Sequence, residues 1–227
     1  MLKTGQRKRL LGDVKNLRQL REMEYAVYQA RAEPARKLRS YKSDLVEIFA
    51  GTANVTLEAL RTGLRVLQPV DEIYGISLND KKDFQWLVAK LKVMKPFMVV
   101  WAPPCTAWSS LQFINRTPEE IQLLQADQDP MLNNLANAIV ELHYEGVHFL
   151  IENPWGTKFW HHPALLRVQD LPGARLERGS MCQFGLKGKF GGLIRKDTGW
   201  LCDLPEVLQK VASPCPGGHD HEPVSYT

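Results

Sequence analysis

The stretch "DLVEIFAG" (44–51), followed by "TANVTLEALRTGL" (52–64), decides the fold. An apolar run that ends on small residues predicts a buried strand that closes on a tight turn. Apolar residues at helical spacing then predict a helix that leaves this turn directly. A strand, a turn and a helix in immediate succession form the first part of a βαβ unit, which indicates an α/β protein.

The rest of the chain continues this alternation. Four further segments predict strands: 65–75, 96–105, 147–155 and 193–202. Three more predict helices: 83–94, 118–146 with a break near Pro130, and 204–212. Strands that alternate with helices favour a Rossmann-type, doubly wound and mostly parallel sheet. We expect a basic helical arm over residues 1–42, an α/β domain over 43–212 and a Cys/His-rich tail over 213–227.

The charge of the chain is unevenly distributed. Residues 1–42 hold twelve Lys and Arg against four Asp and Glu, although the whole chain of 227 residues has a net charge of only +4. Such an arm suits a polyanionic partner, nucleic acid first, or else is the solvated face of a helix. No apolar run approaches the roughly 20 residues of a membrane span, and the basic N-terminus lacks the apolar core of a secretory signal. We therefore expect an intracellular protein that does not contact membranes.

Chemically rich residues follow four of the predicted strands, in "FAGTAN", "VDE", "APPCTAWS" and "ENPW". In a doubly wound sheet, ligands bind beyond the carboxyl ends of the strands. Gly51 and its small neighbours let a ligand approach the backbone, and Asp71 is placed to accept hydrogen bonds from a ribose diol. Asp83 and Phe84 are suited to binding and stacking on a purine. These residues predict a nucleotide-like site, although each of them alone is also typical of an ordinary turn.

Cys105 follows two prolines, which fix the direction of its loop. A thiolate is a strong nucleophile when its pKa is lowered. Attack on an aromatic heterocycle also needs an acid that protonates the ring, and Glu152 at the end of the next predicted strand offers one. The alternative is that Cys105 is a small buried core residue.

The segments "EIFAGTAN" (47–54), "APPCTAWS" (102–109) and "IENPW" (151–155), in this order, resemble the first, fourth and sixth motifs of the cytosine C5-methyltransferases. The spacing from Gly63 to Asp71 is similar to the second motif of that family. The resemblance covers residues 44–155 and implies a Rossmann-type enzyme that uses S-adenosylmethionine. A short chain with a Cys/His-rich tail is closest to the methyltransferase-like domains of some mobile elements.

The resemblance also implies a role for each matching residue. Cys105 would add to C6 of cytosine in DNA, Glu152 would contact N3 and the exocyclic amine, and Arg195 would substitute for the family's arginine motif. The cofactor would be held by Phe49, Ala50, Gly51, Thr52, Asp71, Asp83, Phe84 and Pro104. The substrate would be contacted by Ser109, Asn153 and Trp155, whereas Trp160 is expected in the core.

Departures from the family pattern keep two alternatives open. Thr106, Trp108 and Pro154 replace the usual Gln, Phe and Val, and the sequence has no clear Q-x-R-x-R motif or room for a conventional recognition domain. One alternative is a module that kept the fold, lost the chemistry and binds nucleic acid or a protein partner of unknown identity. The other is a methyltransferase that acts on RNA or on nucleotides.

The tail contains three residues of metal-binding type. Cys215, His219 and His221 fall within "CPGGHDH", and zinc requires four such ligands. Cys182 is the fourth ligand that we expect, and Cys202 is its competitor. The alternative is a tail with two surface histidines. Four cysteines in a chain of this length do not suggest a disulfide scaffold.

Overall fold

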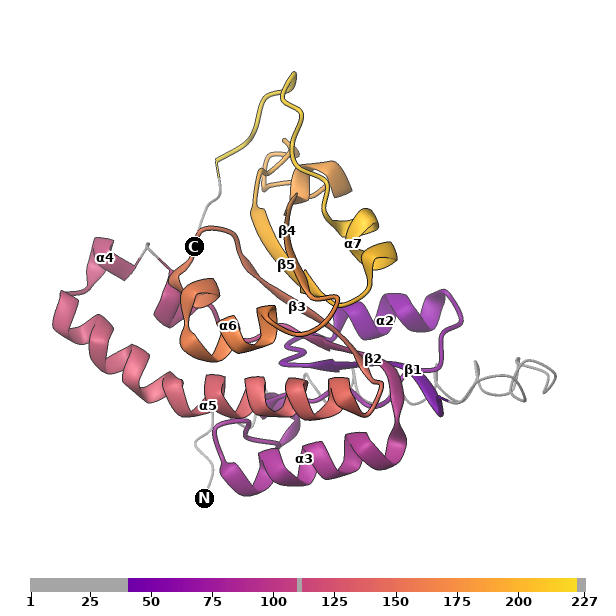
Figure 1. Ribbon diagram of the computed structural model, residues 1–227. Helices are drawn as coiled ribbons and strands as arrows, with labels where there is room; N and C mark the ends of the chain where they lie inside the picture. Colours follow the sequence, from indigo (N-terminus) through magenta and orange to yellow (C-terminus); the bar gives the residue numbers. More distant parts are fainter. Residues whose placement is uncertain (1–40, 110–111, 224–227) are drawn as a thin grey trace, which may run out of the picture. The chain divides into compact units, whose positions relative to one another are not determined.

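The computed structural model of the chain describes residues 41–109 and 112–223, which are coloured along the sequence in Figure 1. The predicted basic arm lies, up to residue 40, outside the described residues. The described part is α/β and divides into two compact units. The first unit comprises residues up to Ala102 together with Glu141–His148, and the second comprises Pro103–Val140 and the residues from Phe149 onward.

The first unit contains the predicted strand, turn and helix. Strand β1 (Ser43–Ile48) pairs in parallel with β2 (Pro96–Trp101), with Val46 opposite Val99. Helix α2 (Asn54–Arg61) begins directly after the turn, and α3 (Lys81–Met94) precedes β2. The parallel pairing and both helices are as the sequence predicts.

The strand predicted over residues 65–75 is wrong. Only two isolated parallel bridges form there, from Val66 to Leu45 and from Val70 to Ile48. Pro69 lies between them and has no N–H group to extend the ladder. The Asp71 side chain then accepts a hydrogen bond from the Ile73 amide and caps the short 3-10 helix η2 (Glu72–Tyr74), which ends the extended run.

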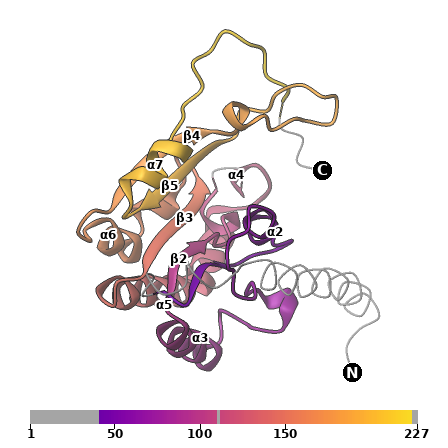
Figure 2. The ribbon, with the colours of Figure 1, turned by 90° about the vertical axis from the view of Figure 1, so that its right-hand side faces the viewer.

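The second unit contains antiparallel strands. Strand β5 (Asp197–Cys202) pairs with β3 (His148–Pro154) on one side and with β4 (Arg175–Ser180) on the other, and both pairings are antiparallel. Helix α7 (Pro205–Val211) packs against β4 and β5 (Figure 2). The expectation of a mostly parallel sheet therefore holds for the first unit only, and the sequence reading missed β4.

Helix α5 (Pro118–Tyr144) is continuous through Pro130, so the predicted break is wrong. An internal proline costs a helix about 3 kcal/mol because it removes one hydrogen bond and crowds the preceding turn. The side chains of Met131, Leu132 and Leu135 are fully buried directly after it. Burying a side chain of this size contributes about 1.5–3 kcal/mol, so this packing outweighs the proline.

Short helical segments connect the elements of the second unit. These are η3 (Thr106–Trp108), α4 (Gln112–Asn115), η4 (Lys158–His161), α6 (Pro163–Gln169) and η5 (Met181–Phe184). Trp160 is 3% exposed and its Nε1 donates to the Pro154 carbonyl, as expected for a core residue. A Cβ at Gly199 would lie 2.7 Å from the Trp160 ring, so only glycine fits there. None of the described helices is long and apolar enough to cross a membrane.

Candidate functional site

The loop that carries Cys105 is fixed at both ends within the second unit. Asn153, which is fully buried, donates through its Nδ2 atom to the Pro103 carbonyl at 3.0 Å. The Cys105 carbonyl accepts hydrogen bonds from the amides of Trp108 and Ser109 at 3.1 and 3.0 Å. The two prolines and these three bonds fix the backbone of the loop that carries the thiol.

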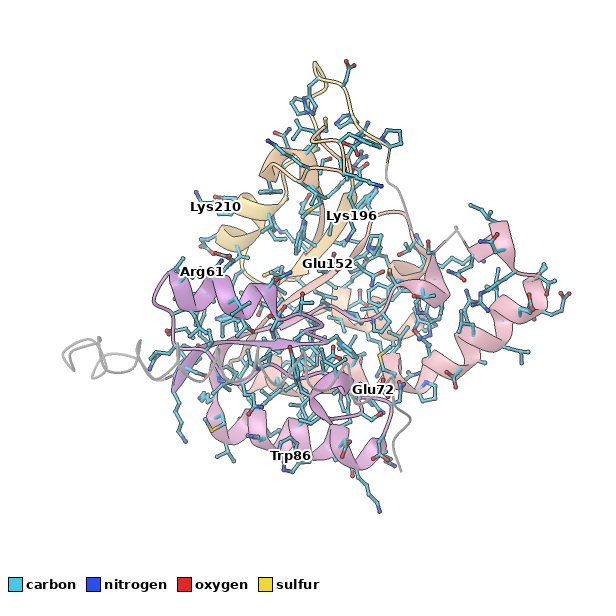
Figure 3. All side chains as sticks on the ribbon, turned by 180° about the vertical axis from the view of Figure 1, so that it is seen from behind. Arg61, Glu72, Trp86, Glu152, Lys196 and Lys210 are labelled. Atoms are coloured by element: carbon cyan, nitrogen blue, oxygen red, sulfur yellow. The ribbon has the colours of Figure 1, made fainter. Side chains whose placement is uncertain are left out.

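The Cys105 thiol lies in the electrostatic field of an acid and a base. Burial raises the pKa of the thiol, the positive charge of Lys196 lowers it, and the negative charge of Glu152 raises it further. Lys196 Nζ lies 3.4 Å from Glu152 Oε1, and both residues are labelled in Figure 3. Glu152 and Lys196 therefore both act electrostatically on the Cys105 thiol, and Lys196 is a residue that the sequence analysis did not predict.

The strand register explains how Glu152 and Lys196 meet. Glu152 lies on β3 opposite Trp200 of β5, and Lys196 immediately precedes β5. The Lys196 carbonyl accepts a hydrogen bond from the Met181 amide at 2.9 Å, which fixes the backbone before the strand. Because β5 is antiparallel to β3, its N-terminal end lies at the C-terminal end of β3, next to Glu152.

Arg195, the expected catalytic arginine, instead pairs with Asp197. Its Nε lies 3.4 Å from Asp197 Oδ2, and its side chain is 46% exposed. Burial opposes ionisation of Asp197, but the Ser180 hydroxyl and the charges of Arg178 and Arg195 outweigh it and hold the pKa of this carboxyl below its usual value. Lys196, and not Arg195, is therefore the basic residue of this segment that contacts Glu152.

The other predicted substrate residues have different surroundings. Asn153 is a buried support of the loop, as described above, and Ser109 is half-buried beside it. Trp155 is 40% exposed and its amide donates to the Asp197 carbonyl, so its ring is available to a ligand. Trp108 is 7% exposed and contacts the His162 ring edge-on, with 5.1 Å between centroids.

In the first unit, the turn between β1 and α2 has an unusual backbone. Phe49, Gly51 and Ala53 all have left-handed φ angles, of 59°, 50° and 57°. Residues other than glycine rarely adopt this conformation, and such residues cluster at functional turns. Ala50 is buried, Thr52 is exposed, and no heavy atom lies within 4 Å of a Cβ built at Gly51, so the turn leaves open space there.

Asp71 holds this turn. Its Oδ2 atom accepts a hydrogen bond from the Gly51 amide at 2.9 Å, and its Oδ1 atom accepts one from Ile73. Tyr74 donates its hydroxyl to the Gly51 carbonyl at 2.9 Å. A carboxylate has about four acceptor sites, so Asp71 retains capacity for a ligand hydroxyl.

Two further predicted residues follow in the same unit. The Asp83 Oδ2 atom accepts a hydrogen bond from the Ser77 amide at 2.9 Å. Phe84 is 4% exposed and belongs to the core. Its ring is therefore not offered to a purine at the surface. Pro104, which the resemblance assigns to the cofactor, is exposed in the second unit.

The sequence reading also missed a buried acid in the first unit. Glu47 is 4% exposed on β1, and its Oε2 atom accepts hydrogen bonds from the Thr56 amide and hydroxyl at 2.8 and 2.7 Å. Burial raises the pKa of this carboxyl above 4.5. An acid inside an apolar run was the available signal in the sequence, and its role is to fix the start of α2.

The predicted metal ligands converge in the second unit. The side-chain donor atoms of Cys182, Cys215, His219 and His221 all lie within 4.8 Å of one another. Cys215 Sγ is 3.7 Å from His219 Nε2 and 3.5 Å from His221 Nε2. This Cys2His2 cluster could hold a metal ion such as zinc, whose structural sites use this donor set.

The competitor Cys202 lies outside the cluster. It is fully buried, its Sγ accepts a hydrogen bond from the Leu204 amide at 3.3 Å, and burial raises its pKa to about 11. The geometry therefore selects Cys182.

The tail reaches the cluster because the backbone of β4 holds it. The Ser180 amide donates to the Ser213 carbonyl, and the Cys215 amide donates to the Ser180 hydroxyl, both at 2.9 Å. Gly217 and Gly218 have φ angles of 78° and 77° and turn the chain back toward Cys215. The protein thus gathers all four ligands with its own hydrogen bonds.

Comparisons of the chain with models of protein families, with curated proteins and with solved structures find no match. The assignment of a function therefore depends on the residues and their geometry.

Proposed function

We propose that this chain is an S-adenosylmethionine-dependent methyltransferase of Rossmann type that methylates C5 of cytosine in DNA. The observation that carries the proposal is the group formed by Cys105, Glu152 and Lys196. A nucleophile, an acid and a cation beside one another are the groups that addition to a pyrimidine requires.

The reaction follows from the chemistry of these side chains. The Cys105 sulfur adds to C6 of the ring, and Glu152 stabilises the electron density that moves toward N3 by hydrogen bonding or proton transfer there. The C5 carbon becomes nucleophilic and accepts a methyl group. Loss of the C5 proton to a base then expels the Cys105 thiolate and restores the aromatic ring.

S-adenosylmethionine, when bound, supplies the electrophilic methyl group. The turn at residues 49–53 and Asp71 fit the polar parts of such a ligand, because the turn is open at Gly51 and Asp71 keeps free acceptor capacity. Phe84 does not fit the stacking role, since it is buried in the core.

Lys196 takes the place in this proposal that the resemblance gives to an arginine. Its ammonium group lies 3.4 Å from Glu152 and lowers the pKa of the Cys105 thiol. It therefore acts as a positioning residue for Glu152 and favours the thiolate of Cys105. Burial of Cys105 acts in the opposite direction and raises the pKa of its thiol.

Two observations favour a second candidate, a module that binds nucleic acid without catalysis. The pKa of the Cys105 thiol is raised rather than lowered, and Phe84 offers no stacking face. Calorimetric titration with S-adenosylmethionine separates the two candidates, because only the enzyme needs to bind this cofactor.

Transfer of a labelled methyl group to DNA, RNA and free nucleotides tests the proposal. The expected result is label on cytosine in DNA, its loss in Cys105→Ala, and normal label in Arg195→Met as the matched surface control. Label on RNA or nucleotides alone would change the substrate class. Label that persists in Cys105→Ala would rule out the covalent mechanism.

A further inference from the structure

The loop "KGKFGGL" (187–193) in the second unit presents an aromatic side chain to solvent. Phe190 is 86% exposed, more than any other large apolar side chain in the described part of the chain. The loop is a closed hairpin in which Lys187 bridges Leu193, and the Gly188 amide donates to the Gly192 carbonyl at 2.8 Å. A single exposed phenylalanine in a flexible loop is common and does not indicate a binding site. The exposure of Phe190 is informative only because the backbone of this loop is held in one conformation.

The Glu222 residue of the tail binds the backbone of this loop, and we call this set of hydrogen bonds the Glu222 clasp. Its carboxylate accepts hydrogen bonds from the Phe190 amide at 3.1 and 3.2 Å and from the Gly192 amide at 2.9 Å. Its own amide donates to the Leu193 carbonyl at 2.8 Å. A Cβ at Gly188 would lie 2.3 Å from this carboxylate, so the glycine is required for the clasp to close.

The clasp makes the exposure of Phe190 a fixed property of the fold. Five hydrogen bonds hold the backbone of the tip in one conformation, and none of them buries the ring. Leaving a phenylalanine in water forgoes about 1.5–3 kcal/mol relative to burying it. A rigid tip that keeps an apolar ring in solvent is suited to burying it against a partner.

The charges of the tip indicate the chemistry of that partner. Lys187 and Lys189 are both exposed, and Lys189 Nζ lies 6.0 Å from the centroid of the Phe190 ring. The Glu222 carboxylate is engaged by backbone amides. An exposed aromatic ring with one lysine beside it and a second lysine on the same short loop matches a nucleic-acid strand, because a base can stack on the ring while its phosphates bind the lysines.

We propose that the loop at residues 187–193 is a nucleic-acid contact in which Phe190 stacks on a base and Lys187 and Lys189 bind phosphates. This inference rests on the proposed function only for the choice of nucleic acid over an anionic membrane.

The metal cluster is linked to the loop by sequence. Glu222 directly follows the ligand His221, so an ion held by the cluster fixes the segment that carries the clasp. We expect removal of the metal with a chelator to expose residues 187–193 to proteases and to weaken nucleic-acid binding, and added zinc to restore both. If chelation changes neither, the link between cluster and loop is wrong.

Fluorescence anisotropy with labelled single-stranded and duplex oligonucleotides, measured over a series of salt concentrations, tests the contact. In the Cys105→Ala background, Phe190→Ala should bind about 5- to 150-fold more weakly, the range expected for loss of one stacked base. Lys189→Gln should reduce the salt slope by about one unit. Phe184→Ala on η5 and Lys210→Gln on α7 are matched controls that should bind as the parent does (Figure 3 labels Lys210).

Glu222→Ala tests the clasp itself, with Glu206→Ala on α7 as its control. It should weaken binding although Phe190 and both lysines are unchanged, because the tip loses its fixed backbone. Because the Phe190 ring is exposed, Phe190→Ala should leave the fold intact. A thermal unfolding curve equal to that of the parent will show this.

Unchanged oligonucleotide binding by Phe190→Ala would overturn the proposal. The proposal would also be overturned if Phe190→Ala weakened binding only to vesicles of anionic lipid, because that result would assign the loop to a membrane surface. These experiments measure binding in the Cys105→Ala background, in which methyl transfer is absent. The proposed loop contact and the proposed methyl transfer are therefore tested independently of one another.

Discussion

Asn153→Asp should loosen the loop that carries Cys105 while it preserves the shape of the side chain. The Asn153 Nδ2 atom donates to the Pro103 carbonyl at 3.0 Å in a fully buried setting. The aspartate has no donor there and places an oxygen against the carbonyl oxygen. The variant loses a hydrogen bond of about 0.5–1.5 kcal/mol and leaves a buried acceptor unsatisfied, at a further cost of about 1–3 kcal/mol.

The expected destabilisation is thus roughly 2–4 kcal/mol, or a fall in Tm of roughly 4–15 °C for a domain of this size. The carboxylate introduced beside the loop should raise the pKa of the Cys105 thiol, as Glu152 does, so this cysteine should react more slowly with iodoacetamide at a given pH. Methyl transfer should fall by about 100-fold, because misplacement of a reacting group by about 1 Å has an effect of that order.

Thermal unfolding and mass spectrometry of the alkylated protein measure both effects. Asn137→Asp is the control, because Asn137 is exposed on α5 and uses its Oδ1 atom as an acceptor, which aspartate retains. A wild-type Tm together with a wild-type alkylation rate in Asn153→Asp would refute the reasoning.

Three further predictions concern single groups. Lys196→Met should raise the pKa of the Cys105 thiol and slow its alkylation at a given pH. Arg195→Met should leave both unchanged, because Arg195 pairs with Asp197. Equal pH profiles of alkylation for the two variants would contradict the role of Lys196. Burial raises the pKa of Glu47 in the folded chain, so the contribution of Glu47 to stability is greatest at low pH and declines as the pH rises from 4.5 through the folded pKa. Glu47→Gln should remove that decline from urea unfolding measured between acid and neutral pH, and an unaltered pH dependence would contradict the assignment. The purified chain without an added histidine tag should contain one zinc ion per molecule by elemental analysis. Cys215→Ser should lose the zinc, whereas Cys202→Ala should keep it. Less than one zinc per molecule in the wild type would contradict the assignment of the cluster as a zinc site.

Local patterns in the sequence predict the first strand, its helix and the Cys/His cluster better than they predict the order and direction of the later strands. The strand, turn and helix at residues 43–61 follow from apolar periodicity, and the choice of Cys105 and Glu152 as candidates follows from their places after predicted strands. The metal ligands follow from residue type in "CPGGHDH", although the choice of Cys182 over Cys202 depends on which cysteine the fold places beside the tail.

The errors have a common physical origin in long-range pairing. Strand β4, "RLERGS", has almost no apolar pattern, because its partner β5 rather than its own composition makes it a strand. Helix α5 passes through Pro130 because tertiary burial exceeds the local penalty. Lys196 could be chosen over Arg195 only once the direction of β5 was known, and the Glu222 clasp joins segments about 30 residues apart, where local patterns carry no information.

The central claim is that the Cys105 sulfur attacks a cytosine ring. An oligonucleotide in which fluorine replaces the C5 proton tests it most directly, because the fluorine cannot leave as a proton and the adduct should persist. The chain, this oligonucleotide and S-adenosylmethionine should give a denaturation-resistant species, and mass spectrometry of its peptides should place the link on Cys105. A link on another residue, or no link in a preparation that binds both the oligonucleotide and S-adenosylmethionine, would contradict the claim.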